Sequence, residues 1–166
     1  WGSYDEGQYG VYDNDPSYAD TYGNLYNWAV VDDSRGVCPE GWHVPSDDEW
    51  KELEMNLGMS ESDANSTDWR GTNEGSKLAG NADLWNDGNL ESNDEFGTSG
   101  FNALPSGYRD GYSGGYGNIG YLGYFWSSSE DSSYDAWHRT LYYEDAAVYR
   151  DDVSRHYGFS VRCVRN

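Results

Sequence analysis

The sequence predicts an α+β domain with one main helix, antiparallel strands late in the chain and long ordered loops. Three observations favour this class. Residues 46–58 carry the start, the apolar face and the stop signal of a single helix. Residues 159–164 alternate between apolar and polar side chains, as a half-buried strand does. The 21 Gly, 8 Trp, 16 Tyr and 4 Phe favour a loop-rich fold whose core is built mainly from aromatic rings.

Residues 1–24 are rich in Gly, Tyr and Asp, and we expect them to form a peripheral N-terminal segment of turns. Residues 25–31 (LYNWAVV) are suited to a buried strand or a short helix. The chain is long enough to bury a core without a metal, so 1–166 is interpreted as a single domain.

The main helix is expected over residues 47–57. Ser46 followed by Glu49 forms a capping box, in which each side chain satisfies a free backbone amide at the helix start. Two aspartates after Ser46 place negative charge at the positive end of the helix dipole. Gly58 is a natural stop. One apolar face is formed by the spacing of Trp50, Leu53 and Leu57.

The second half of the chain predicts one short helix and several strands. A helical turn is expected over 76–79, and 81–123 is expected to be mostly turns. Strands are expected over 124–128, 137–143 and 159–164.

The charge balance excludes several classes of ligand. Lys and Arg number 10 against 30 Asp and Glu, for a formal net charge of −20. Such a surface repels phosphate backbones, so nucleic acid and anionic membranes are poor candidates. A divalent cation or a neutral polar ligand fits better. No run of 18 apolar residues exists, so we expect no membrane insertion. The chain starts at Trp1 without a visible signal peptide, which is typical of a processed or trimmed piece.

The two cysteines, Cys38 and Cys163, have no clustered Cys or His neighbours, which argues against a metal site. A disulfide is favoured over two free buried thiols. If it forms, the compartment is oxidising.

Several separated motifs occur in a characteristic order: GVCPEGWHVPSDDEWKELE, GSKLAG, GFNALPSGYRDG, YFWSSSE, AWHRTLYY and YGFSVRCVRN. From about residue 12 to the end, the chain resembles the Fibrobacter succinogenes major paralogous domain, a bacterial cell-surface module. That family is grouped with C-type-lectin-like folds and is related to the formylglycine-generating architecture. The resemblance implies a compact C-type-lectin-like domain. It also implies a disulfide between a Cys near the first helix and a Cys in the last strand, the places of Cys38 and Cys163.

The tail also resembles the variable region of proteins that retroelements diversify by mutating adenines, whose target domains share the lectin-like fold. Mutated Asn codons yield mainly Asn, Asp, His, Tyr, Ser, Thr and Gly. Because Tyr, Asp and Ser are common throughout the chain, undiversified family members fit the same pattern, and one sequence shows no variability. The candidate ligand-binding residues are His138, Thr140, Tyr142, Asp145, Tyr149, Asp151, Asp152, Ser154, His156 and Tyr157.

Strand alternation predicts a display surface independently of any family. Alternation along 137–143 would turn Trp137, Leu141 and Tyr143 inward. The other side would then carry His138, Thr140 and Tyr142 outward together. Exposed aromatic rings offer rigid contact area, and nearby polar groups offer adaptable hydrogen bonds. The alternative is an ordinary solvated face.

Calcium is the only cofactor for which the sequence offers candidates, because it needs several oxygen ligands at one point. The triplet Trp85-Asn86-Asp87 is similar to the WND motif of calcium-dependent lectins. It lies far from Cys163 and lacks a Glu-Pro-Asn partner, so no sugar-binding calcium site is inferred. A solvated acidic surface is the alternative to structural calcium. The acidic candidates are Asp13, Asp15, Asp87, Asp94 and Glu95.

The sequence predicts no enzyme, because no nucleophile, base and orienting group are indicated. His43, inside the GWHVP stretch, is interpreted as structural. We therefore expect a non-catalytic ligand-binding module, extracellular or at a cell surface, whose partner is a protein or a carbohydrate. Its binding face would lie over 137–157, assisted by the Gly/Tyr loop 107–121. The alternative is a self-assembling structural subunit of a surface filament or appendage, packed through 1–22.

Overall fold

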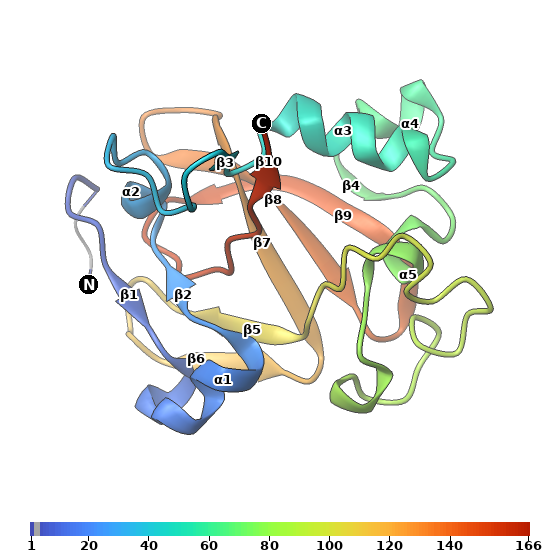
Figure 1. The fold of residues 1–166 in the computed structure, drawn as a ribbon, viewed down its shortest axis with the longest axis horizontal. Helices are drawn as coiled ribbons and strands as arrows, with labels where there is room; N and C mark the ends of the chain where they lie inside the picture. Colours follow the sequence, from blue (N-terminus) through green and yellow to red (C-terminus); the bar gives the residue numbers. More distant parts are fainter. Residues whose placement is uncertain (2–3) are drawn as a thin grey trace.

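A computed structural model describes residues 1 and 4–166 of the chain. Few helices surround one six-stranded sheet (Figure 1), which confirms the α+β class. Neighbouring strands are antiparallel except for the β5–β7 pair, which is parallel. In order across the sheet, the strands are β4 (Asp68–Arg70), β9 (Asp145–Ser154), β8 (Asp135–Tyr142), β7 (Leu122–Glu130), β5 (Ser106–Arg109) and β6 (Tyr116–Ile119).

The remaining elements are short. Two antiparallel pairs are formed by β1 (Tyr9–Gly10) with β2 (Leu25–Tyr26), and by β3 (Trp42–His43) with β10 (Val164–Arg165). The α-helices are α1 (Ala19–Tyr22), α2 (Trp28–Val31), α3 (Asp47–Asn56), α4 (Glu61–Ala64) and α5 (Glu74–Leu78). The 3-10 helices are η1 (Tyr12–Asn14), η2 (Pro16–Tyr18) and η3 (Ala82–Leu84).

The main predicted helix is confirmed as α3. Its capping box is complete: the Glu49 amide donates to Ser46 Oγ at 3.3 Å, and the Ser46 amide donates to Glu49 Oε2 at 2.8 Å. The helix ends at Asn56, one residue before the expected end, with Leu57 as its C-cap. Gly58 follows at φ +119°, a backbone conformation that favours glycine.

Other elements differ from the sequence expectations. Residues 25–31 form both proposed alternatives, since β2 is followed directly by α2. The short second helix, α5, begins two residues before the expected 76–79. The region 81–123, expected to be mostly turns, contains the hairpin β5–β6. The ten-residue strand β9 was not expected at all, because its charged residues hide the apolar alternation.

The expected strand over 159–164 is wrong as a continuous strand. Phe159 and Ser160 make isolated bridges to Tyr26 and Phe125, and the regular strand β10 begins only at Val164. This segment contacts β2 and β7 through single bridges before it pairs with β3, so it does not form one continuous strand.

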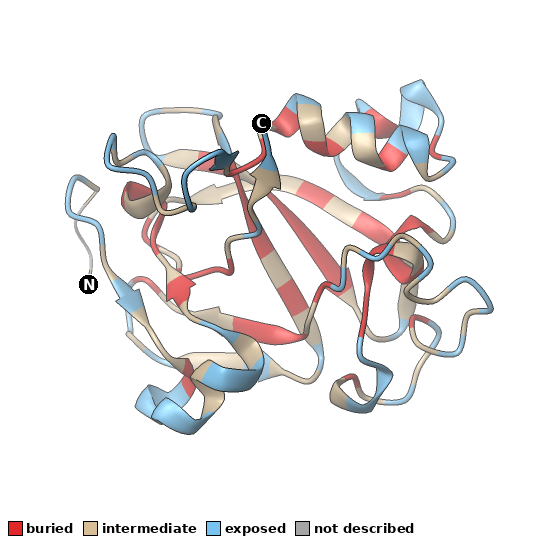
Figure 2. Ribbon diagram, viewed as in Figure 1, coloured by how far each residue is buried: buried red, intermediate tan, exposed pale blue. Residues whose placement is uncertain are grey.

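The main sheet has a hydrophobic core on each face (Figure 2). On the α3 side, Trp50 packs with residues of β7, β8 and β9. On the opposite side, Trp28, Trp126 and Phe159 form a second core. Because both faces are partly covered, alternation along a central strand does not separate buried from exposed residues here.

Buried charges join α3 to the sheet. Asp47 accepts from Arg139 at 2.8 Å and from Arg150 at 2.7 Å. Glu54 accepts from Arg139 at 2.7 Å and from Arg70 at 2.9 Å. All five side chains are at most 8 % exposed, so these ion pairs fix the helix against β4, β8 and β9 in the interior.

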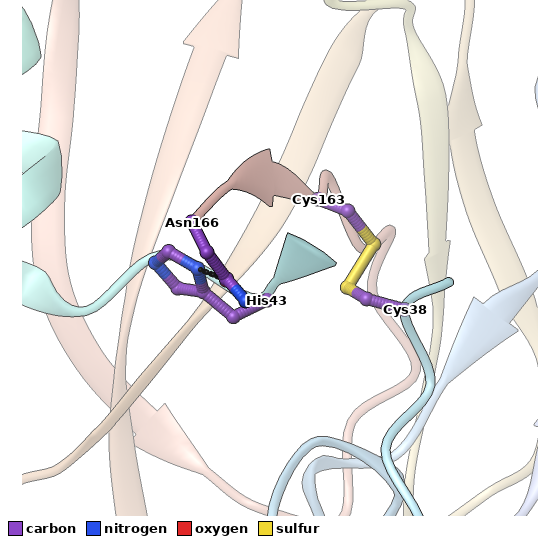
Figure 3. Close-up of a disulfide and its surroundings, with 4 residues drawn as sticks. All are labelled: Cys38, His43, Cys163 and Asn166. Atoms are coloured by element: carbon purple, nitrogen blue, oxygen red, sulfur yellow. Dashed lines mark hydrogen bonds between the residues drawn. A yellow bond between two sulfur atoms is a disulfide. The ribbon is translucent and has the colours of Figure 1, made fainter. Parts of the chain in front are cut away.

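The predicted disulfide is confirmed between Cys38 and Cys163, which are separated by 125 positions (Figure 3). Closing so long a loop stabilises the fold by about 5 kcal/mol in the chain-entropy model. A disulfide of this kind indicates an oxidising environment. In the described part of the chain, no helix has the length and apolar character that a membrane crossing requires.

Candidate functional site

Strands β4, β9, β8 and β7 bring several of the predicted ligand-binding residues to one face of the sheet. Directly paired residues of neighbouring antiparallel strands point to the same side. Trp69 pairs with Tyr149, Tyr149 with Thr140, and Thr140 with Tyr124. In the next row His138 pairs with Asp151. We call the following residues the aromatic face: Trp69, Tyr124, His138, Thr140, Tyr142, Tyr149 and Asp151.

Rings from three strands are in contact on this face. The Trp69 ring centroid lies 5.3 Å from that of Tyr149 and 6.1 Å from that of Tyr142. Tyr149 lies 6.0 Å from His138. Trp69 is 39 % exposed, and both tyrosines are half-buried. The rings therefore form a contiguous platform that reaches solvent.

The expected outward exposure of His138 and Thr140 is wrong, because these side chains are 5 % and 3 % exposed. The C-terminal segment returns over this face and places the Phe159 ring 5.3 Å from His138. His156 is also buried, at 8 % exposure. Inward placement of Leu141 is confirmed. The solvent-reaching part of the aromatic face is consequently narrower than the sequence predicted.

His138 and Thr140, the two most buried of the predicted residues, lie next to Tyr149 on the aromatic face. Nδ1 of His138 and Oγ1 of Thr140 are buried and have no hydrogen-bond partner within the described residues. An unsatisfied buried group of this kind costs about 1–3 kcal/mol. Burial, and secondarily the charge of Arg139, lowers the pKa of His138 to about 4. The imidazole is therefore neutral at pH 7 and can donate or accept.

Carboxylates accept hydrogen bonds from the tyrosine hydroxyls of the aromatic face. We call its half-buried residues Tyr142, Tyr149 and Asp151 the rim. Tyr149 Oη donates to Asp151 Oδ2 at 2.9 Å, and Tyr142 Oη donates to Glu144 Oε2 at 2.7 Å. The hydrogen bond to Glu144 raises the pKa of Tyr142 to about 12, and burial together with Asp151 does the same for Tyr149. Both phenols stay protonated and present neutral, oriented hydroxyls.

A second group contains Ser154, His156 and Tyr157. Tyr112, from the loop expected to assist binding, donates its hydroxyl to Ser154 Oγ at 3.1 Å. Its ring lies 5.5 Å from His156 and 6.2 Å from Tyr157. Tyr157 in turn lies 5.9 Å from Phe159, which contacts His138. The two groups are therefore linked through a chain of rings.

The other two predicted residues lie on different sides of the sheet. Asp145, at the β8–β9 turn, pairs with Tyr142 and so borders the aromatic face, and its carboxylate accepts from the Ala147 amide at 2.9 Å. Asp152 pairs with Trp137, so it points to the opposite side of the sheet from the aromatic face. Burial, then the negative charge of Asp131, raises its pKa.

Sequence reasoning missed Trp69 and Tyr124. Trp69 is far from the tail in the sequence and lies in the three-residue strand β4, between an exposed Asp68 and a buried Arg70. The sequence signal that could have indicated Trp69 as a surface residue was its place in a short stretch of alternating polar and apolar residues. Its contact with Tyr149 follows only from the pairing of β4 with β9.

The acidic residues proposed for calcium do not assemble. Within residues 1 and 4–166, no cluster of three or more His, Cys, Asp or Glu side chains is placed to hold a metal ion. Asp15 caps η2 by accepting from the Ser17 amide at 2.9 Å. Glu95 pairs with Lys77 at 3.0 Å. The structure therefore shows no shared acidic cluster at these described residues, and calcium binding stays a prediction for Asp13, Asp15, Asp87, Asp94 and Glu95.

His43 lies near the disulfide and contacts Asn166 (Figure 3), and its other ring nitrogen contacts Glu49. Nδ1 lies 2.6 Å from Asn166 Oδ1, and Nε2 lies 2.7 Å from Glu49 Oε1. Its partners join β3 to the start of α3 and to the end of β10. This geometry matches the structural role expected from the sequence.

The features above define a small, disulfide-linked α+β domain with an aromatic sheet face. The sequence model of the Fibrobacter succinogenes major domain family matches residues 2–165. The chain belongs to this family, as the ordered motifs predicted. No curated protein and no solved structure matches it significantly.

Proposed function

We propose that this domain is a non-catalytic, extracellular ligand-binding module with a C-type-lectin-like fold, and that the aromatic face contacts the ligand. One observation carries the proposal. A platform of Trp69, Tyr142 and Tyr149 reaches solvent on the face that also carries His138 and Thr140. One buried polar atom of each of these two residues has no hydrogen-bond partner among the described residues. Rigid rings with neighbouring hydrogen-bonding groups are the composition of recognition surfaces.

A neutral oligosaccharide is the ligand class that fits best. The apolar side of a sugar ring packs on an aromatic ring, while its hydroxyl groups bond to neutral phenols and carboxylates. The net charge of −20 disfavours anionic ligands at long range. A polar protein surface is the other candidate partner, and the experiment below separates the two.

The burial pattern also supports diversification of the rim. Tyr142, Tyr149 and Asp151 reach solvent, whereas Arg139 and Arg150 beneath them are buried in ion pairs. Substitution at half-buried positions that reach solvent costs less than removing one partner of a buried ion pair, which costs about 3–5 kcal/mol. Related copies from one genome should therefore differ at the three rim residues and agree at the two arginines. Differences spread evenly over both sets would contradict diversification.

The test is binding of the purified domain to an array of neutral oligosaccharides and to a panel of purified bacterial surface proteins. The triple variant Trp69→Ala, Tyr142→Ala, Tyr149→Ala should bind about tenfold or more weakly, because such ring anchors dominate interface energy. Tyr134→Ala is the matched control, since this tyrosine is 64 % exposed and lies outside the aromatic face.

Unchanged binding by the triple variant, with folding intact by circular dichroism, would refute the assigned face. Equal loss in the Tyr134 control would do the same. Binding confined to the protein panel would replace the oligosaccharide by a protein partner.

Self-assembly is the alternative function, and exposed rings outside the aromatic face favour it. Tyr9, Tyr112 and Tyr134 are 64–70 % exposed. Analytical ultracentrifugation separates the two functions: a recognition module sediments as a monomer, whereas a filament subunit forms ordered polymers with concentration.

A further inference from the structure

A groove of about 300 Å³ lies between α3 and β10, which are neighbours in the fold (Figure 1). Its walls are mainly apolar and are formed by Pro45, Trp50, Leu53, Phe101 and Val164. Three of these side chains, Leu53, Phe101 and Val164, are only half-buried, so apolar surface reaches solvent there. The volume is at the lower limit for ligand pockets and suits one large apolar side chain.

Strand β10 has one paired edge and one open edge. Arg165 is aligned with Trp42 of β3, and the amide of the next residue, Asn166, donates to the Gly41 carbonyl at 3.0 Å. In an antiparallel ladder, hydrogen-bonded pairs alternate with pairs that are not hydrogen-bonded. Arg165 therefore belongs to a pair without hydrogen bonds, and its backbone N–H and C=O point away from β3. No strand among the described residues pairs with this second edge.

The groove runs along the edge of β10 rather than over one of its faces. Neighbouring side chains of a strand point to opposite faces, yet Val164 and Arg165 both line the groove. The free backbone groups of Arg165 consequently lie beside an apolar depression. Open strand edges are templates for pairing with another chain, and an adjacent pocket for a side chain adds specificity.

Two arginines flank this edge without carboxylate partners. The central guanidinium carbon of Arg162 lies 5.3 Å from the centroid of the Phe101 ring. Arg165 lines the groove itself. Both arginines are exposed, and neither lies within ion-pair distance of a carboxylate in the described part of the chain. They are free to pair with acidic groups of a partner.

The carboxylates that line the groove belong to α3, on the other wall. Glu49 is engaged, because Oε1 lies 2.7 Å from His43 Nε2 and Oε2 accepts from the Ser46 amide at 2.8 Å. Glu52 is exposed. The segment 162–165 contains two arginines and no carboxylate, so the strand wall is locally cationic in a chain of net charge −20. Charge complementarity along β10 therefore favours an acidic partner.

We propose that the open edge of β10 and the adjacent groove bind an extended segment of a partner protein, in which an apolar residue is flanked by acidic residues. The segment adds a strand beside β10 and places its apolar side chain in the groove next to Val164. Because side chains alternate along a strand, the residues beside the apolar one lie near Arg165, where an acidic side chain can form an ion pair. The site uses no residue of the aromatic face and is independent of the function proposed above.

The test titrates the ¹⁵N-labelled protein, with its disulfide intact, with three acetylated and amidated five-residue peptides. The first has a central leucine between two glutamates. In the second, serine replaces the leucine, and in the third, lysines replace the glutamates. The first peptide should give saturable NMR shifts of the Arg165 backbone amide and the Trp50 indole signals. The serine peptide should bind about tenfold or more weakly, because a buried leucine side chain is lost, and the lysine peptide should also bind more weakly.

Variants of the arginines test the charge pairing. Arg165→Gln should weaken binding of the first peptide about threefold, the contribution of an exposed ion pair. Adding Arg162→Gln should bring the loss to about tenfold, because separate pairs contribute additively. Arg35→Gln is the matched control, since Arg35 is exposed, pairs with Asp33 and does not line the groove, and it should bind as the unmodified protein does. Dispersed amide spectra establish that each variant is folded.

Absence of a saturable shift with the first peptide, or equal affinity for the serine peptide, would overturn the proposal. Equal affinity for the lysine peptide, or unchanged binding by the double arginine variant, would overturn the acidic class of partner. Shifts of the Trp69 indole in place of the Trp50 signal would place the peptide on the aromatic face and overturn the site. Shifts of the Arg165 and Trp50 signals with protein concentration alone would identify a second copy of this chain as the occupant instead.

Discussion

Replacing Asp47 with Ala tests whether the buried charges hold α3 against the sheet. Asp47 is the first residue of α3 and is only 6 % exposed. Its carboxylate lies 2.8 Å from Arg139, 2.7 Å from Arg150 and 3.0 Å from Lys51. One carboxylate thus serves three cations from the helix and two strands.

The expected loss is about 3–5 kcal/mol, the cost of removing one partner from a buried ion pair. Two guanidinium groups would stay in the interior with fewer acceptors, and the helix would lose about 0.3–1 kcal/mol of dipole interaction. Asp48→Ala is the matched control. It removes the same charge from the same helical turn, but the Asp48 side chain is 92 % exposed and pairs only with Lys51 at 3.2 Å in the described part of the chain. That change should cost less than about 1 kcal/mol.

Urea unfolding with the disulfide intact, followed by tryptophan fluorescence, measures both variants. A loss below about 1 kcal/mol for Asp47→Ala, or no larger than for Asp48→Ala, would refute the reasoning.

The same carboxylate predicts an acid-dependent loss of stability. Burial alone would raise the pKa of Asp47, but hydrogen bonds from Arg150 and the charge of Arg139 hold it well below its usual range. Because the folded pKa lies below the unfolded value of about 3.9, this stability is present above about pH 4 and is lost as the pH falls further. Unfolding free energies measured between pH 6 and pH 2 should fall less steeply for Asp47→Asn than for the unmodified protein.

Three further predictions concern the scaffold. Reducing the disulfide should lower the unfolding free energy by about 5 kcal/mol, and a shift below about 1 kcal/mol in urea titrations with reductant would contradict the loop-entropy account. Gly75→Ala should lower the unfolding free energy by about 1–3 kcal/mol, because the added Cβ would lie 2.2 Å from the Ala147 carbonyl oxygen. An unchanged melting temperature would contradict this, since it would mean that α5 can move away from Ala147 at no cost. The pKa of His43 is raised by Asn166 and then by Glu49, so its stabilising contribution is present at acidic pH and lost as pH rises through the folded pKa. Unfolding free energies of His43→Gln and of the unmodified protein, measured by urea titration across this pH range, should show that the variant loses this pH dependence.

The sequence by itself determined the features whose interactions are local or depend on residue type. The start of α3 follows from a capping box whose partners, Ser46 and Glu49, lie within one helical turn. The family was recognisable from ordered motifs, and that resemblance implied the Cys38–Cys163 bond. Two of the candidate ligand-binding residues named from the tail, Tyr142 and Tyr149, lie on the aromatic face.

Only the tertiary structure decided which of these residues reach solvent and what surrounds them. His138 is buried because Phe159 returns over its strand, and Trp69 joins the same face because β4 pairs with β9. Alternation along a strand predicts only which side of that strand a side chain occupies. Whether that side is buried depends on segments that are distant in the chain, so the sequence pattern alone does not predict it.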